Sequence, residues 1–255
     1  NLTLKFHNKL VGEIQIDALA TKAPVYKRKW VRKKIKKSKL DIKKIRDVKF
    51  EDALIKVLSS PNHSNKSWVT NQYDQMVMGD TVQRSGSDAA IVRIHNKDKA
   101  IAVTVDSSAN YCKSQPKIGG KQIVCENWRN LISVGAKPLA ITNCLNFGNP
   151  ENEEIMGEFA ECLEGIKEAC EFLNYPVVSG NVSFYNGTNK KNIYPTPVIG
   201  GVGIINKLLN PISHKLKKDK SLLLLIGKTF GHIEQSCFLK ENFSKLAIHL
   251  TSVCT

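Results

Sequence analysis

Four short segments of this sequence combine side chains that could bind a phosphorylated ligand together with a metal ion. The first, Gly86-Ser87-Asp88-Ala89-Ala90, places the carboxylate of Asp88 at the start of an expected strand. Magnesium takes oxygen ligands and uses such carboxylates beside phosphate groups. An aspartate that merely caps a turn is the competing interpretation, and this segment alone favours it.

The second segment is Lys117-Ile118-Gly119-Gly120-Lys121, expected to open a helix that also carries Glu126 and Asn130. Two glycines at a helix start would let a phosphate approach the free N–H groups. The spacing is not that of a P-loop. Glu126 and Asn130 are four residues apart, so they share one helix face and could hold a metal together or form an ordinary surface pair.

The third and fourth segments each begin as an apolar strand and continue into polar residues. One is Thr142-Asn143-Cys144-Leu145-Asn146-Phe147-Gly148-Asn149-Pro150, and the other is Pro176-Val177-Val178-Ser179-Gly180-Asn181-Val182-Ser183-Phe184-Tyr185-Asn186. Gly180 would let backbone approach a ligand. Asn181 offers a metal a neutral oxygen, and Ser183 offers a hydroxyl to a phosphate or sugar. The pattern around Ser183 does not match a nucleophile elbow.

The elements that must position these segments alternate between β and α, which predicts an α/β (α+β) fold. Expected strands are 11–16, 89–94, 100–105, 138–142, 177–179, 198–205 and 221–226, and expected helices are 48–58, 119–134 and 151–173. Four glutamates of the last helix, Glu158, Glu161, Glu164 and Glu168, recur at spacings of three and four. That spacing predicts a solvated helix face.

Composition narrows the class of protein. A 255-residue chain with 42% apolar and 24% charged residues is typical of a globular protein, and no run of apolar residues is long enough to span a membrane. Seven cysteines without C-x-x-C spacing predict neither a disulfide framework nor a zinc site, and suit a reducing cytoplasm. From the residues at its two termini, the chain is expected to be a piece of a longer protein.

The net charge of +15 raises the alternative of nucleic-acid binding. Residues 27–46 hold twelve Lys or Arg residues, with Trp30 as their single aromatic side chain. Such a block is more often a solvated linker than a reader of bases. Specific nucleic-acid recognition is therefore not expected, and a non-catalytic fragment with a basic RNA-binding arm remains the alternative function.

Taken together and in order, the motifs resemble those of the synthetase subunit of phosphoribosylformylglycinamidine synthase. They are G-S-D-A-A, K-I-G-G-K, E-x-x-R-N-L, G-A-K-P-L-A-I-T-N-C-L-N-F-G-N-P-E, P-V-V-S-G-N-V-S-F-Y-N and Y-P-T-P-V-I-G-G-V-G. This resemblance covers nearly the whole chain. It implies a ligase that uses ATP and Mg²⁺ to convert formylglycinamide ribonucleotide and ammonia into the amidine in purine biosynthesis, through a phosphorylated amide.

The resemblance also implies an architecture. Residues 1–30 would end a first-half B domain, 31–65 would be a basic linker and helix, 66–207 a second-half A domain like that of aminoimidazole ribonucleotide synthetase, and 208–255 the start of a B-type α/β domain. The A domain is expected to be a mixed sheet with helices on one face. Its barrel would be completed by the synthetase's first half or by a second copy, and a glutaminase subunit and a small accessory subunit would be partners.

Site residues carried over from the family are Asn143 and Gly180 for ATP, Asn181 for Mg²⁺ and Ser183 for the substrate. Asp88, Glu126 and Asn130 match an auxiliary nucleotide and metal site of the family's large form. No catalytic residue is expected here, because the family's catalytic histidines belong to the first half, so the isolated chain is expected not to turn over. Asn143 departs from the family, in which an aspartate stands at this position.

Overall fold

A computed structural model describes residues 1–32, 34, 42–84, 86–189, 191–208 and 235–243. The expected strand at 221–226 lies outside the described residues. In chain order the elements are β1 (Leu2–Phe6), β2 (Lys9–Ile14), α1 (Ile16–Leu19), α2 (Ile42–Arg46), α3 (Phe50–Leu58), the 3₁₀ turn Pro61–His63, α4 (Ser67–Thr70), the 3₁₀ turn Val77–Gly79, β3 (Thr81–Gln83), β4 (Ala90–Arg93), β5 (Ala100–Ser107), α5 (Ala109–Ser114), α6 (Pro116–Ser133), β6 (Lys137–Asn146), α7 (Glu153–Leu173), β7 (Val177–Ser183), β8 (Gly187–Thr188), β9 (Lys191–Asn192), β10 (Thr196–Ile205) and α8 (Cys237–Phe243).

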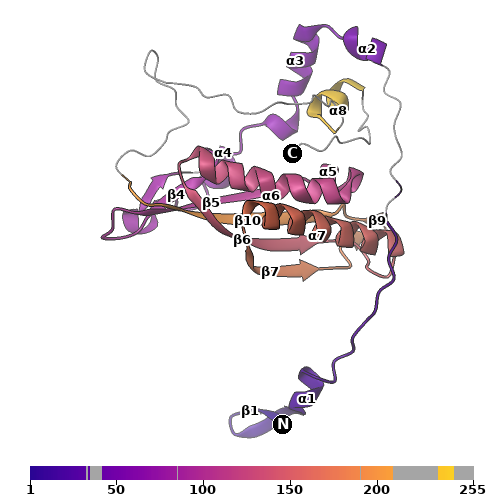
Figure 1. The fold of residues 1–255 in the computed structure, drawn as a ribbon. Coiled ribbons are helices and arrows are strands. Elements are labelled where there is room, and N and C mark those ends of the chain that lie inside the picture. The colour runs from indigo at the N-terminus through magenta and orange to yellow at the C-terminus, as the bar shows by residue number, and fades with distance from the viewer. Residues whose placement is uncertain (33, 35–41, 85, 190, 209–234, 244–255) are drawn as a thin grey trace.

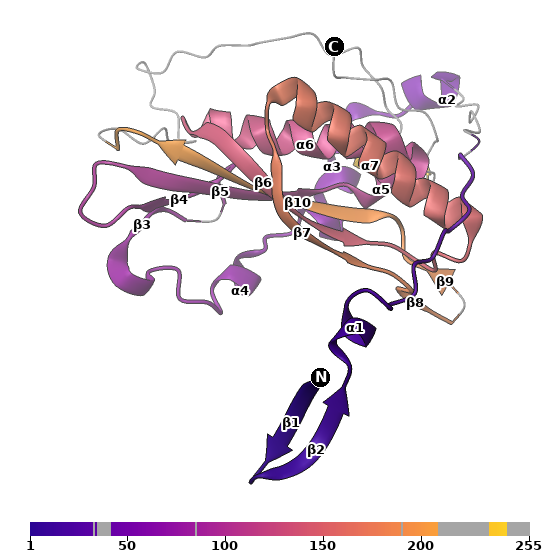
Figure 2. The ribbon, with the colours of Figure 1, turned by 60° about the horizontal axis from the view of Figure 1, so that its bottom comes forward.

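The centre of the molecule is a six-stranded sheet with strand order β3-β4-β5-β10-β6-β7. Strand β10 lies between β5 and β6 and is antiparallel to both, whereas β6 and β7 are parallel. Figures 1 and 2 show α5, α6 and α7 together on one face of this sheet. The expected mixed sheet with helices on one face is confirmed.

The two faces of the sheet differ in burial because only one carries helices. On the helical side Ile91, Ile141 and Ile199 are fully buried, and such side chains each stabilise the fold by roughly 1.5–3 kcal/mol. On the opposite side Val105 is 66% exposed and Val178 is 71% exposed. The hydrophobic core therefore lies between the sheet and the helices.

Helix α6 begins earlier than the sequence predicted, at Pro116, because proline suits the first helical turn. The prediction that Gly119 and Gly120 open this helix for a phosphate is therefore wrong, since both are buried inside it. A Cβ at Gly120 would lie 2.5 Å from the carbonyl oxygen of Cys162 on α7. These glycines serve the close packing of α5, α6 and α7.

Two polar motifs also sit differently from the prediction. The sequence suggested that the strands near 138–142 and 177–179 end before their polar residues. Instead β6 continues to Asn146 and β7 continues to Ser183, so both motifs are part of the sheet. The two strands extend this far because β6 and β7 pair with each other along both motifs. Their side chains consequently follow the alternation of a strand.

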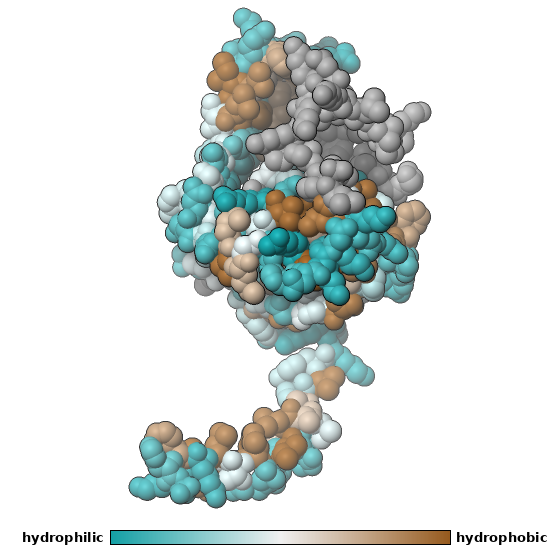
Figure 3. Space-filling model, turned by 90° about the vertical axis from the view of Figure 1, so that its left-hand side faces the viewer, coloured by the Kyte–Doolittle hydropathy of each residue, from teal (hydrophilic) through white to brown (hydrophobic). Residues whose placement is uncertain are grey.

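The described chain before the sheet begins with a hairpin and α1, continues as an extended arm (residues 24–32), and then forms α2, α3 and α4. Strands β1 and β2 pair antiparallel, and the hairpin projects away from the sheet (Figures 1 and 3). Apolar residues lie along it in Figure 3, and Phe6 and Val11 are 68% and 64% exposed. An isolated two-stranded hairpin is marginal in water. The domain boundaries expected at 30, 65 and 207 remain predictions.

Candidate functional site

The parallel pairing of β6 and β7 brings four of the predicted site residues together. Asn143 lies opposite Gly180, Cys144 opposite Asn181, and Asn146 opposite Ser183. Because side chains alternate across a strand, Asn143 shares the helix-covered side with buried Ile141. Asn181 and Ser183 belong to the opposite, open side. The predicted ATP, metal and substrate residues are thus neighbours that face two sides of one edge of the sheet.

Asn143 lies so close to Gly180 that a side chain could not fit there. A Cβ at Gly180 would lie 2.9 Å from the Asn143 carbonyl oxygen and would overlap its side-chain amide oxygen. Asn143 also lines an apolar pocket beneath α7 of about 570 Å³, together with Leu163 and Cys170. The amide oxygen of Asn143 is therefore held against the β7 backbone at Gly180, beside this pocket.

The loop after β7 fixes the hydroxyl of Ser183. Asn186 donates from Nδ2 to Ser183 Oγ at 3.1 Å and to the Phe147 carbonyl oxygen at 3.0 Å. Ser183 Oγ donates in turn to Asn186 Oδ1 at 3.3 Å. On the facing loop, the backbone N–H of Asn149 donates to Asn192 Oδ1 at 2.8 Å. Side-chain amides therefore hold the two loops that follow β6 and β7 in one arrangement.

The auxiliary candidates form a second cluster at the end of β5 and along α6. Ser133 Oγ donates to Asp88 Oδ2 and to the Asn130 carbonyl oxygen, both at 2.8 Å. Asn130 Nδ2 donates to Asp106 Oδ1 at 2.8 Å. Ser133 thus connects Asp88 to Asn130, a contact that the sequence did not predict.

Asp106 is the residue of this cluster that the sequence analysis missed. Burial raises the pKa of its carboxyl, while hydrogen bonds from Asn127, Thr104 and Asn130 act in the opposite direction. Glu126 is exposed as a residue, yet partial burial of its carboxyl raises its pKa, and the negative charge of Asp106 raises it further. The available signal was an acid closing the alternating strand Val103-Thr104-Val105-Asp106.

A buried amide network supports the second cluster. Asn127 is fully buried and donates from Nδ2 to Asp106 Oδ2 at 2.8 Å and to the Ile199 carbonyl oxygen at 3.1 Å. Its Oδ1 accepts from the Tyr175 hydroxyl at 2.8 Å. Burial raises the pKa of Tyr175 far above its ordinary value, so this hydroxyl remains a donor. The carboxylate of Asp106 is therefore anchored on α6, β10 and the end of α7.

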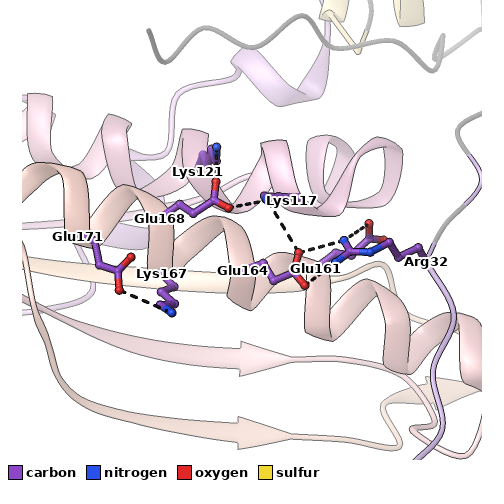
Figure 4. A network of polar contacts seen from close by, with 8 residues as sticks. All are labelled: Arg32, Lys117, Lys121, Glu161, Glu164, Lys167, Glu168 and Glu171. Atoms are coloured by element: carbon purple, nitrogen blue, oxygen red, sulfur yellow. Dashed lines mark hydrogen bonds and ion pairs between the residues drawn. The ribbon is translucent and has the colours of Figure 1, made fainter.

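A row of ion pairs joins α6 to α7 on the outer side of the helical layer (Figure 4). Glu168 lies between Lys117 and Lys121, which lower its pKa to about 2. Arg32 contacts Glu164 through both terminal nitrogens, at 3.0 and 2.8 Å. The predicted solvated face is wrong for Glu158, which is buried and pairs with Lys113 at 2.7 Å.

The two clusters offer a metal ion different ligands. Near Asn181 the site residues supply amide and hydroxyl oxygens, which fit Mg²⁺ where phosphate oxygens complete its shell. The α6 cluster adds the carboxylates of Asp88, Asp106 and Glu126 to the amide of Asn130. Within the described ranges no group of three His, Cys, Asp or Glu residues is close enough to hold a metal without other ligands.

Comparison with known proteins defines the class first. The profile of the family described as AIR synthase related protein, N-terminal domain, matches residues 86–205, which span β4 to β10. The sheet with its layer of helices is therefore similar to the N-terminal domain of AIR synthase related proteins.

Relatives then identify the particular family. The chain is 53% identical over 241 residues to phosphoribosylformylglycinamidine synthase subunit PurL of Pelagibacter ubique, covering 94% of this chain and 33% of that protein. It is 46% identical to PurL of Rhodopseudomonas palustris, covering 93% and 32%. The chain is thus a homologue of PurL and spans about a third of the length of these curated relatives.

Solved structures agree with this assignment. PurLQS from Thermotoga maritima matches with a TM-score of 0.62 and 34% identity, over 80% of this chain and 31% of that one. PurL of the same organism complexed with ATP matches with a TM-score of 0.59 and 33% identity, over the same shares. Among the residues described for this protein, no helix is both long and apolar enough to cross a membrane.

Proposed function

We propose that this chain supplies part of the ATP and Mg²⁺ site of a phosphoribosylformylglycinamidine synthase that acts in the cytoplasm. The reaction converts formylglycinamide ribonucleotide, ATP and ammonia released from glutamine into the amidine, ADP and phosphate. The observation that carries this proposal is the β6–β7 register, which gathers Asn143, Gly180, Asn181 and Ser183 at one sheet edge. Solved structures of the T. maritima PurL with ATP and with FGAR support it.

Each of the four residues has a role that its surroundings allow. The amide of Asn143 fills the space that a side chain at Gly180 would need and contacts the nucleotide there, and Gly180 contacts it through its backbone. The Ser183 hydroxyl, oriented by Asn186, contacts the ribonucleotide substrate. Asn181 is exposed on the open side of β7 and supplies one neutral oxygen ligand to Mg²⁺.

The chemistry needs positioning more than it needs an acid or base from this chain. ATP phosphorylates the amide oxygen of the substrate, and ammonia then displaces phosphate to leave the amidine. When bound, Mg²⁺ offsets the negative charge of the transferred phosphoryl group. Asn143 on the helix-covered side and Ser183 on the open side each act as a fixed dipole that positions one ligand, and such preorganised groups lower the barrier without covalent participation.

The open face of the sheet supports a partner that completes the domain. Exposed valines and an isoleucine lie along β5, β7 and β10, namely Ile101, Val103, Val105, Val178 and Val202. An apolar face of this kind marks an interaction surface. We assign this face to contact with the A domain of the synthetase's first half. A second copy of the chain is the alternative partner. A glutaminase subunit and a small accessory subunit complete the assembly.

Titration calorimetry of Mg-ADP into the purified chain tests the nucleotide assignment. Asn181→Ala is expected to weaken binding, whereas Asp88→Ala, in the α6 cluster, is expected to leave it unchanged. Because both residues are exposed, neither change should alter folding. Loss of binding with Asp88→Ala alone would move the nucleotide to the auxiliary cluster. A folded chain that binds no Mg-ADP would contradict the proposal.

A further inference from the structure

The arm before the sheet is docked along α7, and this docking depends on a glycine. The backbone N–H of Val31 donates to the Glu153 carbonyl oxygen at 3.2 Å, at the first turn of α7. One helical turn further on, a Cβ at Gly157 would overlap the carbonyl oxygen of Val31. Figure 4 shows Arg32 reaching from the arm to Glu161 and Glu164 of the same helix. The arm is therefore packed against the helix at backbone distance.

Arg28 extends this contact from the arm to the loop that follows β7. Its Nη2 donates to the Tyr185 hydroxyl at 3.2 Å, and its Nη1 lies 3.6 Å from Glu151 Oε1. The Tyr185 hydroxyl donates to the same Glu151 oxygen at 3.2 Å. Arg28 also lies 4.8 Å from the ring centre of Tyr26. One guanidinium thus joins three segments that are far apart in the sequence.

The loop that Arg28 contacts is the one that orients Ser183. Tyr185 has a φ of 61°, a left-handed conformation that costs free energy for a non-glycine residue and must be held by its surroundings. Its N–H donates to the Gly148 carbonyl oxygen at 3.0 Å, and the N–H of Asn186 donates to the Phe147 carbonyl oxygen at 3.2 Å. Asn186 in turn holds the Ser183 hydroxyl.

We propose that Arg28 is a positioning residue, through which the docked arm fixes the Tyr185 loop and hence the hydroxyl of Ser183. The inference rests on the proposed function for its meaning in catalysis. The connection consists of the hydrogen bond from Arg28 to the Tyr185 hydroxyl, the backbone of the loop from Tyr185 to Asn186, and the hydrogen bond from Asn186 to Ser183. A planar guanidinium can donate to a hydroxyl and a carboxylate at once, which a lysine does less well.

Hydrogen exchange of the full chain, followed by mass spectrometry, tests this linkage. Arg28→Ala is expected to accelerate exchange of the Tyr185 and Asn186 amides at least about fivefold, because the left-handed loop loses its outer support. Tyr185→Phe should have a similar effect, and the double variant should exchange no faster than either single one. Arg28→Lys should restore part of the protection. Arg93→Ala, which breaks the exposed Asp80 pair elsewhere, is the matched control.

A second variant tests the arm without touching Arg28 or the loop. Gly157→Ala favours the helix itself but leaves no room for Val31, so tryptic cleavage after Arg28 and Lys29 should accelerate together with loop exchange. Unchanged exchange in α6 would show that the domain remains folded. Unchanged loop exchange in Arg28→Ala, or fully additive effects with Tyr185→Phe, would overturn the inference. Failure of wild-type Mg-ADP binding counts against the proposed function alone, since the exchange rates decide this linkage separately.

Discussion

The two clusters of candidate site residues are built in opposite ways. On α6 and β5, carboxylates are held by buried amides, and Asp106 is anchored by the fully buried Asn127. At the β6–β7 edge, Asn143, Asn181 and Ser183 are neutral and lie on strand residues that are exposed or half-buried. Substitutions in the first cluster should therefore lower the free energy of unfolding, whereas substitutions in the second should change it little.

This difference indicates where a nucleotide can bind and leave. An anchored carboxylate cluster contributes to the stability of the fold through its buried hydrogen bonds. A neutral edge beside the pocket beneath α7 suits a ligand that binds and leaves. Sequence alone did not distinguish the clusters, because the side chains that anchor Asp106 come from another element.

The largest expected effect is loss of stability in the α6 cluster. Asn127→Ala should lower the free energy of unfolding by about 3 kcal/mol, because it leaves the Tyr175 hydroxyl without its buried acceptor and removes one hydrogen bond from the half-buried Asp106 carboxylate. Urea denaturation followed by circular dichroism measures this. Asn181→Ala at the other cluster is the control and should change it by less than about 0.5 kcal/mol. Equal losses would remove the distinction between the clusters.

An intermediate effect is expected from making the neutral cluster more like the charged one. Asn143→Asp adds a carboxylate beside Gly180, so the affinity for Mg-ADP should rise about tenfold, equivalent to about 1.4 kcal/mol. Affinity for ADP with EDTA should fall, because the new charge then repels the phosphates. Calorimetry with and without Mg²⁺ separates the two terms. A rise in both conditions would contradict an electrostatic origin.

The smallest effect is expected from the ion pairs that join α6, which carries the charged cluster, to α7, which lies above the neutral one. Lys117 and Lys121 lower the pKa of Glu168 to about 2, below the ordinary value of roughly 4.3. The pairs therefore stabilise the protein above about pH 4.5, and this contribution is lost as the pH falls toward 2. Glu168→Gln should flatten the pH dependence of the urea midpoint in this window. High salt should reduce the effect in the wild type, because Glu168 is exposed.

The sequence predicted the order of elements well, and it predicted their polar ends poorly. The amphipathic pattern of 151–173 and the strand pair around Asn96 are confirmed, because local periodicity determines them. The extension of β7 to Ser183 depends on pairing with β6, which lies more than thirty residues earlier. Asp106 was missed for the same reason, since its partners Asn127 and Asn130 are on another element.

The basic arm shows the same limit of sequence reasoning. Its charge suggested a linker or an RNA-binding segment, and nothing local indicated where Arg28 and Arg32 would lie. In the structure both are engaged by acidic residues of the same domain, Arg28 by Glu151 and Arg32 by Glu161 and Glu164. These contacts disfavour the RNA-binding alternative for the described part of the arm, since a phosphate would have to displace them.

The central position of β10 has a consequence for biosynthesis of the chain. Strand β10 lies between β5 and β6, yet it follows both in the sequence, and Ser107 contacts Pro197 across 90 residues. Until residue 205 has left the ribosomal exit tunnel, β5 and β6 therefore lack the strand with which both pair. Apolar strands that lack their partner favour aggregation during that interval. A nascent chain stopped before β10 should remain protease-sensitive, and one extended past it should become resistant.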